Sequence, residues 1–114
     1  VSAVLGSDPA LVNQLIAAGE ECGDRLWPLP LWPDYADDLQ GEFSDLKNMG
    51  VAGEAGTIYG AAFLRQFVPD TIPWAHLDIA GTAWVEKEKA GLLPGATLAG
   101  AMALITWLKT AARP

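Results

Sequence analysis

The only histidine of the chain stands in the segment WAHLDIAG, residues 74–81, two positions before an aspartate. If this segment is a strand, His76 and Asp78 project from the same face, because side chains alternate between the two faces of a strand. An aspartate can orient an imidazole in a metal-binding or catalytic group. This pair is therefore the first candidate for chemistry in the sequence.

Neither a zinc site nor a hydrolase triad follows from the pair. Zinc usually takes three or four His, Cys or carboxylate ligands, and side chains two positions apart on a strand are separated by about 7 Å. No serine of the chain stands in a nucleophile elbow, so the pair lacks a recognisable nucleophile. The residues favour a buried His76 that is satisfied by hydrogen bonds.

Two other patterns are weaker still. The segment GVAGEAG, residues 50–56, lies between a possible strand and a possible helix, as a phosphate-binding loop does. Its spacing is not GxGxxG, no GK[ST] follows, and Glu54 would repel a phosphate, so close packing of loop and helix is favoured. Asp37 and Asp38 are adjacent and point apart, which is typical of a solvated surface.

Composition limits the function further. The chain has 114 residues, 51% of them apolar and five of them tryptophan, which is typical of one folded domain or part of one. The net charge is −7, and residues 1–45 hold nine acidic residues and one basic residue. Because phosphate contacts need clustered Lys and Arg, we expect no nucleic-acid partner.

Compartment signals are few. The single Cys22 allows no internal disulfide and favours a reducing compartment. The N-terminal segment VSAVLG has no basic start, so we expect no signal peptide, and without an initiator methionine the chain is either processed or part of something longer. The uncharged run from Ala90 to Leu108 is split by Pro94 and Gly95, which favours a core helix over a membrane span.

The first helix is the most clearly marked element. Ser7 or Asp8 can accept hydrogen bonds from the free amides of its first turn, and Pro9 has no amide to leave unsatisfied there. Gly23 is a plausible stop. Apolar side chains recur at helical spacing and predict the buried face, namely Leu11, Leu15, Ala18 and Cys22.

The remaining elements predict an α/β fold in which helices cover a small sheet. Only two strands are predicted, too few for a stable sheet, so we expect further strands to be missing. The predicted elements are helices at 6–22, 35–42, 54–67 and 96–113, a packed extended arm at 27–35, strands at 43–49 and 74–80, and a loop at 81–95.

Several segments, in the same order, closely resemble the C-terminal part of the leucyl (cytosol) aminopeptidases. They are GDRLWPLPLWPDY, NMG, AGTIYGAAFLRQFV, WAHLDIAGTAW and GATLAGAMALITWL, and together they cover almost the whole chain. The resemblance implies that residues 1–114 form the C-terminal segment of one catalytic domain. That domain would be a helix-flanked, mixed-sheet metallopeptidase domain of the α/β class.

The resemblance also implies roles for single residues. Ala80 and Ala83 would line the pocket for the N-terminal side chain of the substrate, and Met49 would help to form the pocket for the following residue. It implies no catalytic residue and no metal ligand in this chain. The two divalent ions, zinc or manganese, would be held by a lysine and carboxylates upstream, including an NTDAEGR-type block that is absent from this sequence.

The implied function is that of a metal-dependent leucyl aminopeptidase, a cytoplasmic homo-hexamer that removes N-terminal residues from peptides. This segment would supply pocket walls, would pack against the N-terminal remainder of the enzyme, and would be inactive alone. No membrane partner is expected. The alternative is a non-enzymatic binding or assembly module that retains only the scaffold of the family.

Overall fold

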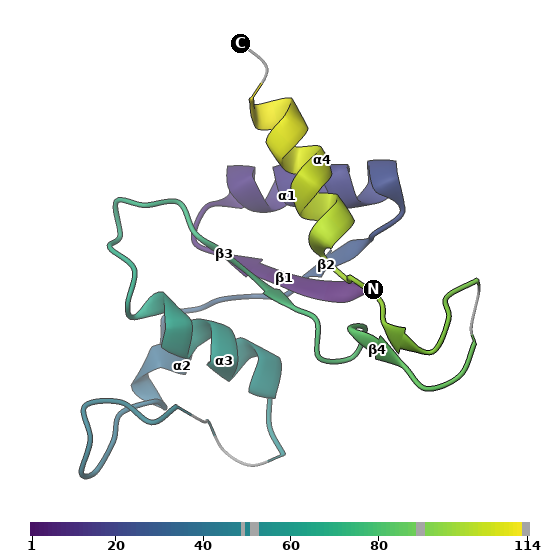
Figure 1. Cartoon of the computed structure of the whole chain (residues 1–114). Coiled ribbons are helices and arrows are strands. Elements are labelled where there is room, and N and C mark those ends of the chain that lie inside the picture. Colours follow the sequence, from purple (N-terminus) through teal and green to yellow (C-terminus); the bar gives the residue numbers. More distant parts are fainter. Residues whose placement is uncertain (49, 51–52, 89–90, 113–114) are drawn as a thin grey trace.

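The chain folds into two small sheets and four helices over the residues that the structure describes. This structure is a computed structural model that describes residues 1–48, 50, 53–88 and 91–112 (Figure 1). The elements are β1 (Ser2–Gly6), α1 (Pro9–Cys22), β2 (Leu26–Pro28), α2 (Asp34–Asp37), α3 (Gly56–Arg65), β3 (Ala75–Asp78), β4 (Trp84–Val85), β5 (Gly95–Ala96) and α4 (Ala101–Ala111).

The main sheet has three strands in the order β2-β1-β3. Strand β1 pairs in parallel with β2, and it pairs antiparallel with β3 in a register that sets Val4 opposite Leu77 and Leu5 opposite His76. The sheet is therefore mixed, and helices lie on both of its sides (Figure 1). The predicted α/β class with a helix-flanked mixed sheet is confirmed.

One side of the sheet is covered by α1 and α4, which lie against each other (Figure 1). Their buried core joins one residue of β1, one of α1, one of β2 and one of α4, namely Val4, Leu15, Leu26 and Ala103. Helix α1 forms as its ends predict. Asp8 accepts a hydrogen bond from the amide of Ala10 at 2.7 Å, and Gly23 follows the helix with φ at +80°, the left-handed conformation that glycine adopts freely.

On the other side of the sheet, α3 lies against β1 and α2 packs against α3 (Figure 1). A second apolar cluster of Leu39, Tyr59 and Ala62 forms there. The Tyr59 hydroxyl donates a hydrogen bond to the Asp38 carboxylate at 2.8 Å, and so it ties the chain that follows α2 to α3. Helix α3 lies within the predicted range of 54–67 and is shorter at both ends.

Strand β1 is the main element that sequence reasoning missed. The segment VSAVLG carries no local strand signal, yet it forms the central strand of the sheet. Val4 and Leu5 are fully buried and project to opposite faces, one toward α1 and α4, the other toward α3. Because both faces are covered, the strand shows no alternation of apolar and polar residues. It supplies one of the strands that the predicted sheet lacked.

The predicted strand at 43–49 is wrong over residues 43–48. This segment instead turns back on itself through a single bridge between Gln40 and Leu46, and the Phe43 side chain is fully exposed. Polar residues on both faces leave such a strand nothing to bury.

The C-terminal third departs from prediction in a smaller way. Strand β3 lies within the predicted range of 74–80. The predicted loop at 81–95 contains β4, which pairs with β5 in a short antiparallel hairpin. Helix α4 therefore begins at Ala101, five residues later than predicted, after Gly100 in the left-handed region with φ at +80°. Over the described residues, every helix is too short or too polar to cross a membrane.

The burial of Leu5 gives a direct test of the central role of β1. Leu5→Ala removes most of a fully buried side chain and leaves a cavity, so we expect the free energy of unfolding of the full-length protein to fall by about 2–5 kcal/mol. Leu5→Val keeps most of the volume and should cost only about 1 kcal/mol. Chemical denaturation measures both. Equal losses in the two variants would contradict the packing described for β1.

Candidate functional site

The turn that follows β3, residues 79–83, is closed by its own backbone. The amides of Thr82 and Ala83 both donate to the carbonyl oxygen of Ile79, at 2.9 and 2.8 Å. The turn begins directly after Asp78, the last residue of β3, and ends directly before β4. Its position is therefore set by the main sheet on one side and by the hairpin on the other.

Asp78 fixes the first half of this turn. Its Oδ1 atom accepts a hydrogen bond from the amide of Ala80 at 2.9 Å. A hydrogen bond from the Thr57 side chain, at the start of α3, together with the Ala80 amide and the nearby His76, lowers the pKa of the Asp78 carboxyl. Hydrogen bonds to the charged form stabilise it, so Asp78 stays ionised to lower pH than an ordinary aspartate.

Two hydroxyl contacts fix the second half of the turn. The Thr97 hydroxyl donates to the carbonyl oxygen of Thr82 at 2.5 Å, and the Thr97 amide donates to the carbonyl oxygen of Ala83 at 2.9 Å. The hydroxyls of Thr82 and Ser2 lie 2.7 Å apart, which links the turn to the start of β1. Ser2 is almost fully buried. The turn is thus held from three separate segments of the chain.

His76 lies on the same face of β3 as Asp78 but has a different environment from the predicted one. Its ring stacks on the Trp74 indole, with centroids 6.2 Å apart and planes inclined by 13°. The side chain is half-buried, and over the residues that the structure describes its partner is this aromatic ring and not a hydrogen-bonding group. The prediction of a buried, hydrogen-bonded histidine is therefore wrong, because His76 is half-buried and stacks on Trp74.

The described residues do not fit a metal ion. Within the ranges given above, no three His, Cys, Asp or Glu side chains come close enough to share one. The pair formed by His76 and Asp78 has no third ligand there, and zinc needs at least three from the protein. The site is therefore built from backbone and small side chains.

The structure brings two of the three predicted substrate-binding residues together. Ala80 is exposed and Ala83 is half-buried, and both belong to the turn 79–83. Met49 lies outside the described residues. The supports of the turn, Thr57 and Thr97, were not identified from the sequence. They reach the turn from distant segments, and threonines of that kind carry no local signal.

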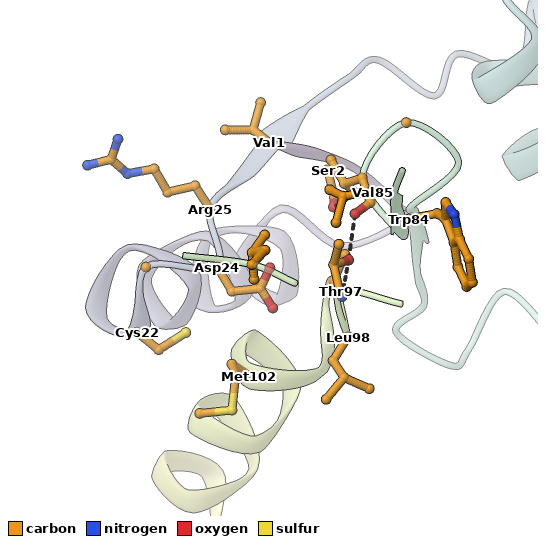
Figure 2. A pocket seen from close by; sticks show the side chains of 15 residues that line it. Val1, Ser2, Cys22, Asp24, Arg25, Trp84, Val85, Thr97, Leu98 and Met102 are labelled. Atoms are coloured by element: carbon orange, nitrogen blue, oxygen red, sulfur yellow. Dashed lines mark hydrogen bonds between the residues drawn. The ribbon is translucent and has the colours of Figure 1, made fainter. Parts of the chain in front are cut away.

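A cavity of about 530 Å³ lies beside the turn (Figure 2). It is bounded by the start of β1, the end of α1, the hairpin and the start of α4. Gly81 and Thr82 contribute the side of the turn that faces it, whereas the two alanines are not among its lining residues. Its walls mix apolar and polar groups, including Asp24, Thr97, Leu98 and Met102 (Figure 2).

Comparison with known proteins identifies the family. Residues 1–105 match the model of the catalytic domain of the cytosol aminopeptidase family. The chain belongs to this family. The resemblance found in the sequence is therefore confirmed, and the turn 79–83 is part of a cytosol aminopeptidase catalytic domain.

Curated cytosol aminopeptidases match nearly the whole chain but are much longer. A probable cytosol aminopeptidase of Geobacter sp. (strain M21) is 50% identical over 108 residues, which are 95% of this chain and 22% of that protein. A probable cytosol aminopeptidase of Geobacter sulfurreducens is 49% identical over 113 residues, again 22% of its length. The chain thus spans about a fifth of the curated relatives that it matches.

Solved structures share the fold. The cytosol aminopeptidase of Coxiella burnetii superposes with a TM-score of 0.88 at 36% identity, over 98% of this chain and 24% of that one. The bottromycin maturation enzyme BotP, solved in complex with Mn, gives a TM-score of 0.90 at 31% identity, over 98% of this chain and 25% of that one. The aminopeptidase fold of this segment is therefore established by solved relatives.

The role of Thr97 in holding this aminopeptidase turn can be tested by a nearly isosteric change. Thr97→Val removes the hydroxyl that bonds the Thr82 carbonyl and the Ala99 amide, so we expect the full-length protein to lose about 1–2 kcal/mol of unfolding free energy. Thr71→Val, at an exposed threonine, should change it by less than about 0.5 kcal/mol. Thermal denaturation compares the two variants. A loss at Thr97 no larger than that at Thr71 would show that the turn does not need this contact.

Proposed function

We propose that this chain is the C-terminal segment of the catalytic domain of a metal-dependent leucyl aminopeptidase, and that the turn 79–83 forms a wall of its substrate pocket. The enzyme removes N-terminal residues from peptides. The observation that carries the proposal is the locked turn itself, which holds Ala80 and Ala83 on a framework fixed from β1, α3 and the hairpin. The family match over residues 1–105 supports the reaction class.

A wall of this kind suits an apolar side chain. Ala80 and Ala83 present methyl groups only, so they leave room for a medium or large side chain and offer it no polar group. Burial of a leucine side chain in such a pocket stabilises the complex by about 1.5–3 kcal/mol. A pocket wall can select among substrate side chains by shape only if its backbone is rigid. The hydrogen bonds of the turn 79–83 supply that rigidity.

We assign no catalytic residue and no metal ligand to this chain. We propose that the two divalent ions, zinc or manganese, are held by the remainder of the protein, as the family resemblance implies. The manganese complex of BotP supports metal dependence in the parent. We propose, from the family resemblance alone, that Met49 helps to form the pocket for the second residue of the substrate.

Exposed apolar side chains support packing against further protein. Trp84, Leu93 and Leu98 are 66%, 75% and 74% exposed, and they lie around the hairpin and the approach to α4. Surfaces of this kind are rarely left open to water. We propose that the N-terminal remainder of the enzyme and neighbouring subunits of a homo-hexamer cover them. The name shared by the relatives supports a cytoplasmic enzyme.

The pocket assignment is tested by placing a bulky side chain on the wall. In the full-length enzyme, Ala83→Phe should lower kcat/KM for leucyl substrates by about 10–100-fold and change it little for alanyl substrates, because only the longer side chain meets the phenyl ring. Steady-state kinetics on leucyl and alanyl p-nitroanilides measure this ratio.

Ala10→Phe is the matched control. Ala10 is exposed at the start of α1, which the register of β1 and β3 places at the opposite end of the sheet from the turn. The Ala10→Phe substitution should leave kcat/KM unchanged for both the leucyl and the alanyl substrate. If Ala83→Phe lowers kcat/KM equally for leucyl and alanyl substrates, Ala83 does not line the pocket.

The placement of the metals elsewhere predicts that the 114-residue chain is inactive alone. An aminopeptidase assay of this chain with added Zn²⁺ or Mn²⁺ should show no turnover above buffer, while the full-length enzyme is active. Robust turnover by the isolated chain would contradict the proposal. An inactive full-length protein would favour the alternative of a non-enzymatic assembly module.

A further inference from the structure

We infer that Asp78 is a positioning residue that sets the preference for long N-terminal side chains by fixing the place of Ala80. This inference rests on the proposed function, because it assumes that Ala80 lines the substrate pocket. The starting observation is that Asp78 occupies the last position of β3 and its carboxylate reaches forward to the turn.

The backbone of Asp78 is fixed by the sheet. It stands opposite Ala3 in the antiparallel pairing of β1 with β3, and the residue that follows Ala3 is the fully buried Val4. Its Oδ1 atom accepts the Ala80 amide at 2.9 Å, and the Thr57 side chain at the start of α3 is the largest of the influences that lower the pKa of its carboxyl. One carboxylate therefore connects the end of the sheet to the turn, and it lies near the start of α3.

The two ends of the turn are held by different means. At the Ala83 end, main-chain bonds to the Thr97 amide and to the Ile79 carbonyl act together with the hydroxyl contacts of Thr97 and Thr82. At the Ala80 end, the amide of Ala80 is bound by the side chain of Asp78. A single substitution can thus release Ala80 while the rest of the turn stays closed, which makes Asp78 the residue that decides where this methyl group lies.

The chemistry of the carboxylate suits two donors at once. An aspartate bonding the amide two residues ahead forms a local turn, and asparagine can form the same turn through its amide oxygen. Asparagine can also donate from its NH₂ group to the Thr57 hydroxyl oxygen. Alanine can do neither. The contact with Ala80 lies at the surface of this chain, so its loss frees the turn more than it weakens the fold.

The experiment compares Asp78→Ala and Asp78→Asn in the full-length enzyme. The measured quantity is the ratio of kcat/KM for leucyl p-nitroanilide to that for alanyl p-nitroanilide. We expect Asp78→Ala to lower this ratio about tenfold, mainly through a higher KM for the leucyl substrate, because the alanyl side chain is too short to use the displaced wall. Asp78→Asn should keep the ratio within about twofold of the wild-type value.

This ratio is insensitive to a purely structural role. Partial unfolding lowers the amount of active enzyme and therefore lowers the apparent kcat/KM for both substrates by the same factor. The ratio then stays constant. A constant ratio in Asp78→Ala would overturn the inference. So would an Asp78→Asn variant as poor as Asp78→Ala, because the hydrogen bond to Ala80 would then not be the cause.

Thr57→Val keeps the test decisive if Asp78→Ala does not fold. It removes only the hydroxyl that supports Asp78, and we expect a smaller fall of the same ratio, about two- to threefold. An unchanged ratio in Thr57→Val would then count against the inference. Ala83→Phe, measured in parallel, distinguishes failure of the positioning role of Asp78 from failure of the pocket assignment. If it changes the ratio and the Asp78 variants do not, only the positioning role fails; if neither changes it, the pocket assignment fails.

Discussion

The antiparallel pairing of β1 with β3 is the constraint on which the rest of this structure depends. It sets Val4 against Leu77 on one face and Leu5 against His76 on the other, and each face is then covered by helices. A shift of one residue would exchange the two faces and place His76 in the core with α1. The register therefore decides both the packing and the direction in which Asp78 points.

Given this register, only a few further contacts are needed to hold the turn 79–83 in place. Once Asp78 is fixed at the end of β3, the turn 79–83 needs only one side-chain acceptor, one threonine on the hairpin side and one buried serine to be held. The pocket role that we propose for this segment depends on shape, which small side chains on a well-held backbone provide.

Features encoded by neighbouring residues were predictable, and features encoded by distant ones were not. Helix α1 was predicted closely because Asp8 and Gly23 mark its ends locally. Strand β1 was missed because its pairing with β3 joins residues as far apart as Ala3 and Asp78, 75 positions away. The contacts of Thr97 with the turn were missed for the same reason. The pocket alanines came from family resemblance, since an alanine carries no chemical signal of its own.

The wide separation of β1 and β3 in the chain also orders the events of folding. β1, α1 and β2 form a parallel strand–helix–strand unit within residues 1–28 and need only a short loop closure. β3 and α4 join it only after the whole intervening chain has been closed, at a greater entropic cost and a slower rate. Because α1 and α4 cover each other in the folded chain, we expect the apolar face of α1 to be exposed during synthesis until α4 has formed, and misassociation to be easiest in that interval.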